Sequence, residues 1–327
     1  MGNRGQDQRG WTSLKSILIT GGTGSFGHAF VRRILNDPKV ERIAIYSRGE
    51  HLQEEMERKF KDDRLRFFIG DVRDLDRLEM AMNGVDTVIH AAALKIVPIA
   101  EYNPTECIAT NVRGAENVVT AAIRAGVQRV VALSTDKAVN PINLYGASKL
   151  AAEKIFVAAH ALSAGKTRFN VVRYGNVSGS RGSVLPLFKK LKAEGKPLMV
   201  TDENMTRFWI TLDQSIQLVM AAIDLLHQDL DSQILVPKIP SIRIVDLAKA
   251  FDHEMVLNTG IRPGEKIHET LITEDESRTT TEGYSDWLKG PFYCIQPPGS
   301  INLKYLWRYS SDTNNEWLST EQLKAMI

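Results

Sequence analysis

Hydrophobic residues in the first half of the chain form short, nearly continuous runs separated by longer amphipathic segments. The runs cover residues 16–20, 42–46, 65–69, 86–90 and 129–133. A run that is apolar throughout, without alternation, is typical of a parallel strand covered on both faces. Helical periodicity fills the intervals, for example over 25–35 and 104–125. These repeated strand–helix units predict an α/β fold with a doubly wound parallel sheet.

The pattern becomes less regular after Gly175, where Pro, Gly and polar residues separate short apolar segments. A strand is expected over 169–173, a helix over 213–226 with Asp213 as N-cap, and a returning strand over 233–236. The expected organisation is a mobile N-terminal tail at 1–14, a large α/β domain at 15–175 that is completed by about 208–236, and a smaller C-terminal substrate lobe at 176–207 and 237–327.

Size and composition narrow the class of protein. A chain of 327 residues with 43% hydrophobic and 24% charged residues has the composition of a soluble globular protein. The formal net charge of +2 argues against a nucleic-acid-binding surface. The sequence contains no run of about 18 apolar residues, so no membrane span is expected. The two cysteines, Cys107 and Cys294, fit no metal-ligand spacing. They indicate a reducing cytoplasm and no metal site.

A glycine-rich turn connects the first expected strand to the first expected helix. Gly21, Gly24 and Gly27 suit a tight turn, close approach of the backbone to a pyrophosphate, and close packing of the helix on the strand. The helix N-terminus adds free N–H groups and a partial positive charge. In this strand–turn–helix context the spacing predicts a Rossmann-type dinucleotide site. The alternative is a glycine-rich connection without a ligand.

Residues after the second and third strands bear on the choice of cofactor. The second strand ends in Tyr46-Ser47-Arg48, where an NAD site usually has an acidic residue. Arg48 can pair with a 2′-phosphate that a carboxylate would repel, so NADP is expected. The alternative is a solvated surface arginine. Asp71 and Val72 follow the third strand and are placed to border an adenine.

Reactive side chains directly follow the strand at 129–133. The segment 134–137 reads Ser-Thr-Asp-Lys, and Tyr145 and Lys149 lie four residues apart on one face of an expected helix. Open α/β sheets bind ligands at this end of their strands. The unperturbed pKa of tyrosine is about 10, and the Lys149 ammonium is expected to favour the phenolate. The pair could then deprotonate an alcohol while hydride leaves the same carbon; the alternative is chance spacing.

Asp136 and Lys137 supply a second acid/base pair that a simple alcohol dehydrogenase does not need. They could protonate a leaving hydroxyl and remove a carbon-bound proton, which together make an elimination. The alternative is an exposed charge pair in a turn. Arg207, Arg262 and Glu265 suggest an anionic substrate, because arginine can hold a diphosphate and Glu265 could bind ribose hydroxyls. His90 is expected to be a packed core residue.

The chain resembles the extended short-chain dehydrogenases/reductases, specifically the inverting UDP-N-acetylglucosamine 4,6-dehydratases of the pseudaminic acid pathway. The resemblance runs from about Ser16 to the C-terminus and rests on the segments 70–74, 91–95, 134–138, 140–141, 145–149, 172–177, 205–210, 262–266 and 309–311. Retaining dTDP-glucose-type dehydratases typically have Asp-Glu at the positions that match Asp136 and Lys137. Large membrane-anchored relatives commonly have Met at the position that matches Tyr145. The combination in this chain resembles the short inverting type. Ile96 departs from the family's usual His, which leaves open the local shape beside the nicotinamide.

The resemblance implies a carbon–oxygen lyase. Tyr145 would deprotonate the C4 hydroxyl of the sugar as hydride passes from C4 to NADP⁺. Lys137 would then take the C5 proton, Asp136 would protonate the departing C6 hydroxyl, and hydride would return to C6, so that water is lost with inversion at C5. Thr135 would hydrogen-bond the C4 oxygen and Lys149 would support Tyr145. A cytoplasmic homo-oligomer is expected.

The implied ligand-binding residues form two sets. For NADP they are Gly21, Thr23, Gly24, Ser25, Phe26, Gly27, Ser47, Arg48, Asp71, Val72, Ala91, Ala92, Ala93, Lys95, Asn111, Tyr145, Lys149 and Val177. For the UDP-sugar they are Lys95, Thr135, Asn176, Arg207, Arg262 and Glu265.

Two other functions remain open from the sequence. A UDP-sugar 4-epimerase shares the hydride step but needs no elimination at C6. A regulator could instead sense NADP without turnover. Such regulators often lose the Tyr or the Lys of the reactive pair, and this chain has both.

Overall fold

The computed structural model describes residues 14–180, 182–252, 256–297 and 306–327. Most of the expected N-terminal tail, residues 1–13, lies outside this range. Leu14, which was assigned to the tail, is fully buried in the main hydrophobic core. Leu14 therefore belongs to the core of the large domain and not to a tail.

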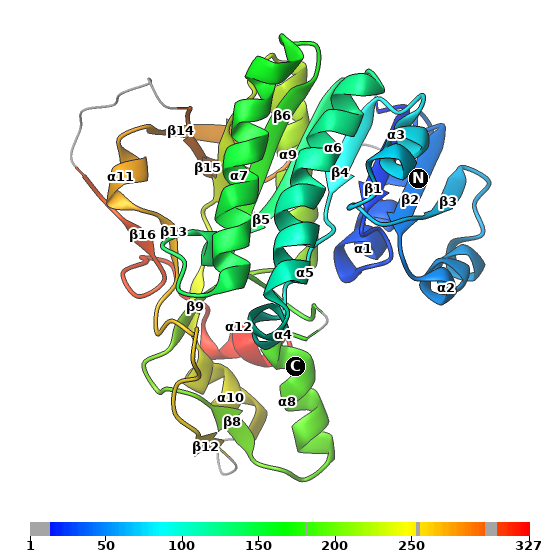
Figure 1. Cartoon of the computed structure of the whole chain (residues 1–327). Coiled ribbons are helices and arrows are strands. Elements are labelled where there is room, and N and C mark those ends of the chain that lie inside the picture. Colours follow the sequence, from blue (N-terminus) through cyan, green and yellow to red (C-terminus); the bar gives the residue numbers. More distant parts are fainter. Residues whose placement is uncertain (1–13, 181, 253–255, 298–305) are drawn as a thin grey trace, which may run out of the picture.

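A nine-stranded sheet forms the centre of the molecule (Figure 1), in the order β14-β15-β10-β6-β5-β4-β1-β2-β3. Neighbouring strands from β3 to β10 pair in parallel. Their bounds are β1 Ser16–Thr20, β2 Arg42–Ser47, β3 Leu65–Ile69, β4 Thr87–His90, β5 Arg129–Thr135, β6 Arg168–Tyr174 and β10 Ile234–Pro237. Most of these strands are buried along nearly their whole length, which confirms the doubly wound parallel sheet.

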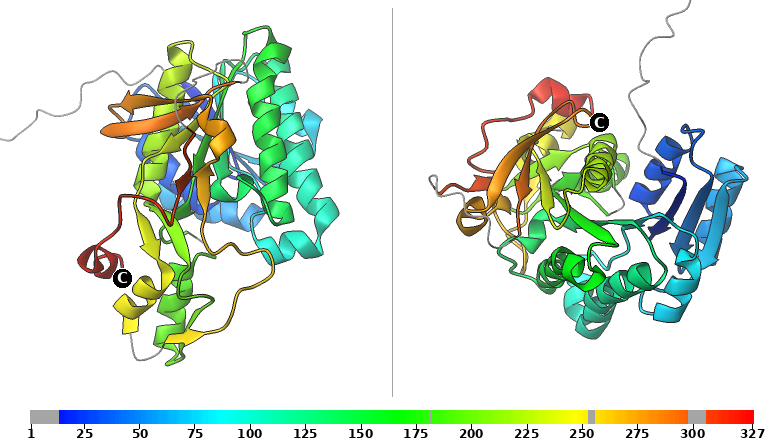
Figure 2. Two further views of the ribbon diagram at one scale, coloured as in Figure 1. Left: turned by 90° about the vertical axis from the view of Figure 1, so that its left-hand side faces the viewer. Right: turned by 90° about the horizontal axis from the view of Figure 1, so that it is seen from above.

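Helices cover both faces of the sheet (Figures 1 and 2). The helices α3 (Leu75–Met82), α6 (Gly114–Arg124) and α7 (Leu144–Ser163) cover one face, and α1 (Ser25–Ile34) and α9 (Leu212–His227) cover the other. Helix α2 (Glu50–Phe60) lies at the β2–β3 edge.

Two expected helices differ from the prediction. The stretch 104–125 consists of α5 (Pro104–Ile108), a π-helical turn (Ala109–Arg113) and α6. The N-cap of α9 is Thr211 instead of Asp213, because the Thr211 hydroxyl accepts a hydrogen bond from the Gln214 amide at 3.1 Å in a capping box.

The C-terminal region contributes a hairpin to the central sheet. Strands β14 (Thr280–Ser285) and β15 (Gly290–Ile295) are antiparallel, and β15 pairs with β10. The sequence pattern had placed all of 237–327 in the substrate lobe. The hairpin satisfies the hydrogen-bonding edge of β10, a long-range pairing that leaves no local signal in the sequence.

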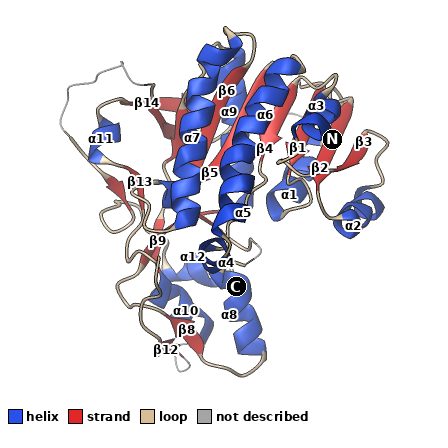
Figure 3. Ribbon diagram, in the orientation of Figure 1, coloured by secondary structure: helices blue, strands red, loops and turns tan. Residues whose placement is uncertain are grey.

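The smaller lobe lies below the carboxyl ends of the parallel strands (Figure 3) and has a hydrophobic core of its own. It contains α8 (Val184–Ala193), β8 (Leu198–Val200), α10 (Ile244–Asp252), β12 (Val256–Asn258) and α12 (Thr320–Lys324). A three-stranded sheet of β7 (Asn176–Val177), β9 (Thr206–Ile210) and β11 (Ser241–Arg243) connects it to the large domain. The remaining elements are α4 (Val97–Tyr102), β13 (Thr270–Ile272), α11 (Glu274–Ser277) and β16 (Tyr309–Ser310). None of the helices in the described ranges is long and apolar enough to span a bilayer.

Candidate active site

The glycine-rich turn has the shape of a phosphate cradle. Gly21 has φ of +65°, and a Cβ atom there would lie 2.9 Å from the Cα of Ala92. A Cβ at Gly27 would lie 2.0 Å from the carbonyl oxygen of Gly22, so the helix packs as closely as the spacing predicted. Gly24 is the N-cap of α1, and no side chain caps it. The N-terminal turn of α1 lines the cavity with its partial positive charge, and a dinucleotide pyrophosphate fits this cradle.

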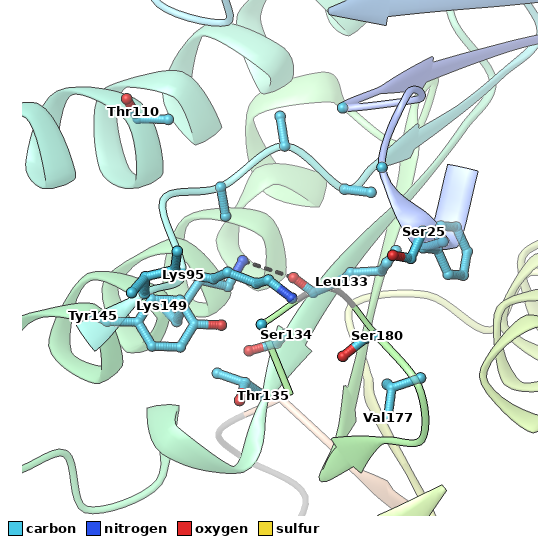
Figure 4. A pocket seen from close by; sticks show the side chains of 18 of the residues that line it. Ser25, Lys95, Thr110, Leu133, Ser134, Thr135, Tyr145, Lys149, Val177 and Ser180 are labelled. Atoms are coloured by element: carbon cyan, nitrogen blue, oxygen red, sulfur yellow. Dashed lines mark hydrogen bonds between the residues drawn. The ribbon is translucent and has the colours of Figure 1, made fainter. Parts of the chain in front are cut away.

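A cavity of about 970 Å³ extends from this turn along the carboxyl ends of the strands to the smaller lobe (Figure 4). Most of the expected site residues line it: Gly21, Thr23, Gly24, Ser25, Phe26, Ser47, Arg48, Asp71, Val72, Ala91, Ala92, Ala93, Lys95, Thr135, Lys137, Tyr145, Lys149, Asn176, Val177 and Arg262. The expected residues that lie outside this lining are Gly27, Asn111, Asp136, Arg207 and Glu265.

Arg48 lies at the end of the cavity formed by β2 and β3. Its side chain is 59% exposed, and its guanidinium lies 3.7 Å from the Asp71 carboxylate. Asp71 also accepts a 2.7 Å hydrogen bond from Arg73. Burial raises the pKa of Asp71 while Arg73 and Arg48 lower it, and the net direction is down. Arg48 is thus held near the cavity with its guanidinium accessible to an anionic group.

Helix α7 begins unusually close to the short 3₁₀ turn η2 (Asp136–Ala138). Asn143 caps the helix by accepting a hydrogen bond from the Gly146 amide at 2.8 Å. A Cβ at Gly146 would lie 2.1 Å from the carbonyl oxygen of Lys137, so glycine is required for this approach. The contact places Tyr145, at the start of α7, beside the reactive turn.

Tyr145 and Lys149 both reach the cavity from α7 (Figure 4). Burial raises the pKa of Tyr145 to about 12, although Lys137 and a hydrogen bond with Thr135 lower it. The sequence predicts that Lys149 is the cation that favours the Tyr145 phenolate. In the structure, Lys149 Nζ donates to the Leu133 carbonyl at 2.7 Å, and the ammonium that lowers the Tyr145 pKa is that of Lys137. Burial also lowers the pKa of Lys149 to about 8, against the opposing effect of Glu153.

Asp136 and Lys137 form a close ion pair at the end of β5. Lys137 Nζ lies 3.0 Å from Asp136 Oδ1, which also accepts the Thr135 hydroxyl at 2.9 Å. Asp136 is fully buried, and its Oδ2 has no hydrogen-bond partner among the described residues. Lys137 is 27% exposed and lines the cavity. Burial lowers the pKa of Lys137, whereas the carboxylates of Asp136 and Glu269 raise it. The net shift of this pKa is upward, so the free site holds an ammonium.

Glu269 is a site residue that the sequence did not reveal. It precedes β13, and its buried Oε1 lies 3.5 Å from Lys137 Nζ. Neither a motif nor a periodic pattern marks this position, and only the packing of β13 beside η2 brings it to the reactive turn. Ile96, the departure from the family pattern, lines the cavity and is half exposed.

Arg207 and Asn111 support the walls of the cavity instead of lining it. Arg207 donates to the carbonyls of Thr206, Lys266 and Ile267 at 2.7–3.0 Å. Asn111 exchanges hydrogen bonds with the backbone of Leu94 and donates to Ser148. The sequence predicts that Arg207 binds the substrate and Asn111 the cofactor, whereas in the structure both side chains are hydrogen-bonded to the protein itself.

The end of the cavity nearest the smaller lobe is formed by both domains. Arg262 lines it, and its guanidinium lies 3.8 Å from Glu265. Asn143 Nδ2 donates to the Gly264 carbonyl at 2.8 Å, which ties this loop to α7. Asn176 also lines the cavity, and its buried Oδ1 lacks a hydrogen-bond partner within the described part of the chain.

His90, expected in the core, is buried there. Its Nδ1 lies 2.8 Å from the Thr20 hydroxyl, and burial with the nearby Lys149 charge lowers its pKa to about 3. It is therefore neutral at physiological pH and takes no part in the cavity lining.

Comparison with known sequences places the chain among nucleotide-sugar enzymes. A family model described as polysaccharide biosynthesis protein matches residues 17–287. The inverting UDP-N-acetylglucosamine 4,6-dehydratase of Campylobacter jejuni is 49% identical over 330 residues, which cover 96% of this chain and 97% of the relative. The UDP-glucose 4-epimerase of Rickettsia conorii is 47% identical over 333 residues, which cover 96% and 95%.

Solved structures confirm the fold. The X-ray structure of Pen from Bacillus thuringiensis has a TM-score of 0.86 at 35% identity and covers 96% of this chain and 97% of that one. The dTDP-glucose 4,6-dehydratase DesIV of Streptomyces venezuelae, solved with NAD, has a TM-score of 0.70 at 24% identity and covers 77% and 86%. Because the matches run through the Rossmann-type sheet, the glycine turn and the Tyr–Lys helix, this chain belongs to the polysaccharide biosynthesis protein family, of the extended short-chain dehydrogenase/reductase type.

Proposed function

We propose that this protein is a nucleotide-sugar dehydratase that converts UDP-N-acetylglucosamine to the 4-keto-6-deoxy sugar with inversion at C5. The observation that carries the proposal is a second acid/base pair beside Tyr145: Lys137 lines the same cavity as Tyr145, and the buried Asp136 lies 3.0 Å from its amine. The close similarity to a dehydratase of that name supports the substrate.

The glycine cradle, Arg48, Ala91–Ala93 and the Tyr145–Lys149 face would hold a nicotinamide dinucleotide. When bound, this group would accept hydride from the sugar and later return it. The protein's own contribution is to bind the sugar, to move protons at C4, C5 and the C6 hydroxyl, and to keep the reacting carbon dry.

Tyr145 is proposed to take the proton of the C4 hydroxyl. With a pKa near 12 the free residue is a phenol, so the base form needs further positive charge. Lys137 already lowers this pKa, and a cationic ligand ring beside Tyr145 would lower it further. Thr135, whose hydroxyl contributes to lowering the Tyr145 pKa, is proposed to hold the C4 oxygen.

Lys137 is proposed to remove the C5 proton once C4 is a carbonyl, and Asp136 to protonate the departing C6 hydroxyl. Lys137 must first lose the proton that its two carboxylates hold on it. Asp136 is adjacent, and its Oδ2 is free to carry a proton. Once Lys137 has released its proton and Asp136 carries one at Oδ2, the pair supplies a neutral amine and a carboxylic acid together. These are the two forms that elimination requires.

A 4-epimerase remains the second candidate, because the relative from Rickettsia conorii carries that name at almost the same identity. The two reactions share oxidation at C4 and differ at C6. Incubation with UDP-N-acetylglucosamine followed by proton NMR separates them. A new C6 methyl signal is expected, and a galacto-configured product with its C6 hydroxymethyl intact would establish the epimerase instead. Bound cofactor without turnover of any UDP-sugar would favour a regulatory protein.

NADP is proposed as the cofactor, because an arginine follows β2 where NAD sites usually carry an acid. The exposed Arg48 guanidinium can pair with a 2′-phosphate. We further propose a cytoplasmic homo-oligomer that acts in the pseudaminic acid pathway, on the basis of the family resemblance and of cysteines that are free and buried.

Arg48→Glu should weaken binding of NADP by about tenfold or more and leave NAD binding nearly unchanged, since a charge-assisted pair to phosphate is lost and a repulsive one is gained. Fluorescence titration of each cofactor measures both constants. Arg32→Glu, at an exposed position of α1 that does not line the cavity, is the matched control. Equal losses for NADP and NAD would contradict the assignment.

A further inference from the structure

A buried carboxylate from the segment that enters β13 contacts the reactive turn. Glu269 immediately precedes β13, and its backbone is fixed by three hydrogen bonds. Its amide donates to Ser311 Oγ at 2.9 Å, and its carbonyl accepts from the Ser311 amide at 2.8 Å and from Ser310 Oγ at 3.2 Å. The carboxylate therefore has a defined position before any ligand binds.

The Glu269 side chain is 3% exposed and is surrounded by cations from three segments. Lys137 Nζ and Arg207 Nε lie 3.5 and 3.8 Å from its Oε1, and Lys266 Nζ lies 3.9 Å from its Oε2. Burying a carboxylate is costly unless charges compensate it, and these three side chains do so.

Two of these cations are also fixed by the backbone. Arg207 donates to three carbonyl oxygens, and Lys266 Nζ donates to the Val139 carbonyl at 2.5 Å. Neither of them lines the cavity, whereas Lys137 does. Of the three, Lys137 is the one whose amine meets both Glu269 and the space where a ligand binds.

We propose that Glu269 is a positioning residue for Lys137: it holds the Lys137 amine between itself and Asp136, at the cavity wall, and keeps that amine protonated until the sugar is in place. The inference rests on the proposed dehydratase reaction and adds to it the segment that enters β13. Packing of that segment beside η2 places the Glu269 carboxylate at the reactive lysine.

The charged and titratable groups around Lys137 determine the expected result. They are Asp136 on its own turn, Glu269 and Lys266 in the segment before β13, Arg207 on β9, Lys95 after β4, and Tyr145 on α7. Without the Glu269 charge, Asp136 is the remaining carboxylate in this set, and Arg207, Lys266 and Lys95 oppose the ammonium. An opposite charge at this distance typically shifts a pKa by about one to three units.

The test is the pH dependence of solvent-deuterium incorporation at C5 in the Glu269→Gln variant, measured by NMR during turnover of UDP-N-acetylglucosamine. The rate should rise with pH as Lys137 loses its proton. In the variant we expect this rising limb to move to lower pH by at least about one unit. Reduction of the nicotinamide in a single turnover uses Tyr145 and not Lys137. Any loss in the rate of this reduction should therefore be smaller than the loss in the maximal rate of C5 exchange.

Glu274→Gln is the matched control, because it makes the same exchange five residues away at an exposed site outside the cavity lining. Its pH limb should coincide with that of the wild type. If the rising pH limb of C5 exchange does not move in a folded Glu269→Gln protein, the proposal is overturned. Exchange at C5 in the wild type would still support the dehydratase in that case. Absence of C5 exchange in the wild type would instead reject the proposed function, and with it this inference.

If glutamine at 269 prevents folding, Glu269→Asp provides the same test. Aspartate retains the charge but withdraws it from Lys137 by one methylene group. We expect the limb to move in the same direction by a smaller amount. An unmoved limb in the folded aspartate variant would count against the positioning role.

Discussion

Lys137→Ala should lower solvent-deuterium incorporation at C5 of the sugar by at least about 100-fold, the range typical of a lost general base. Lys137 lines the cavity, and its amine lies 3.0 Å from Asp136, which can take its proton. Alanine removes the amine and leaves Asp136 buried without its cation. Turnover in deuterium oxide, followed by NMR of the sugar, measures the exchange.

The matched control for this change is Lys189→Ala, at an exposed position of α8 that does not line the cavity. It should exchange C5 at the wild-type rate. Because oxidation at C4 precedes the C5 step, Lys137→Ala should still form some reduced nicotinamide in a single turnover. Retained exchange at C5 in a folded Lys137→Ala protein would show that another base acts there.

Tyr145→Phe should lower the rate of nicotinamide reduction in a single turnover by about 10²- to 10⁴-fold, because the C4 hydroxyl loses its proton acceptor. The change deletes one oxygen from a buried ring and leaves the α7 packing in place. The absorbance transient of the reduced nicotinamide reports the step directly, without product analysis.

Tyr284→Phe provides the comparison for that experiment, since Tyr284 is 69% exposed on β14 and does not line the cavity. Its transient should match the wild type. A normal transient in Tyr145→Phe would exclude Tyr145 as the C4 base. Loss of the transient in Tyr145→Phe together with its survival in Lys137→Ala would assign the two proton transfers to two residues.

The fold could be derived from local patterns because each parallel strand is buried on both faces and therefore appears as an apolar run. The turn at Gly21–Gly27 was equally visible, since backbone shape and close packing demand glycine there. The β14–β15 hairpin was not visible, because its place beside β10 depends on a pairing across more than forty residues, for which a sequence carries no local mark.

The sequence indicated which residues lie near the cavity, but it indicated the directions of their side chains less well. Thr135, Lys137 and Tyr145 all reach the cavity. Arg207 was expected to hold substrate, but its guanidinium turns to backbone carbonyls. The spacing of Tyr145 and Lys149 suggested that Lys149 supports the phenolate, whereas the nearby Lys137 lowers the Tyr145 pKa.

Residue types and spacing alone determined the parallel sheet, the dinucleotide turn and the presence of two acid/base pairs after β5. These features are local, because each is encoded within one strand, turn or helix. Tertiary structure alone decided which charged groups surround Lys137, since Glu269 lies 132 positions later in the chain and reaches it only through the packing of β13 beside η2. Electrostatic effects act through space over a few ångströms, so the order of residues along the chain cannot reveal them.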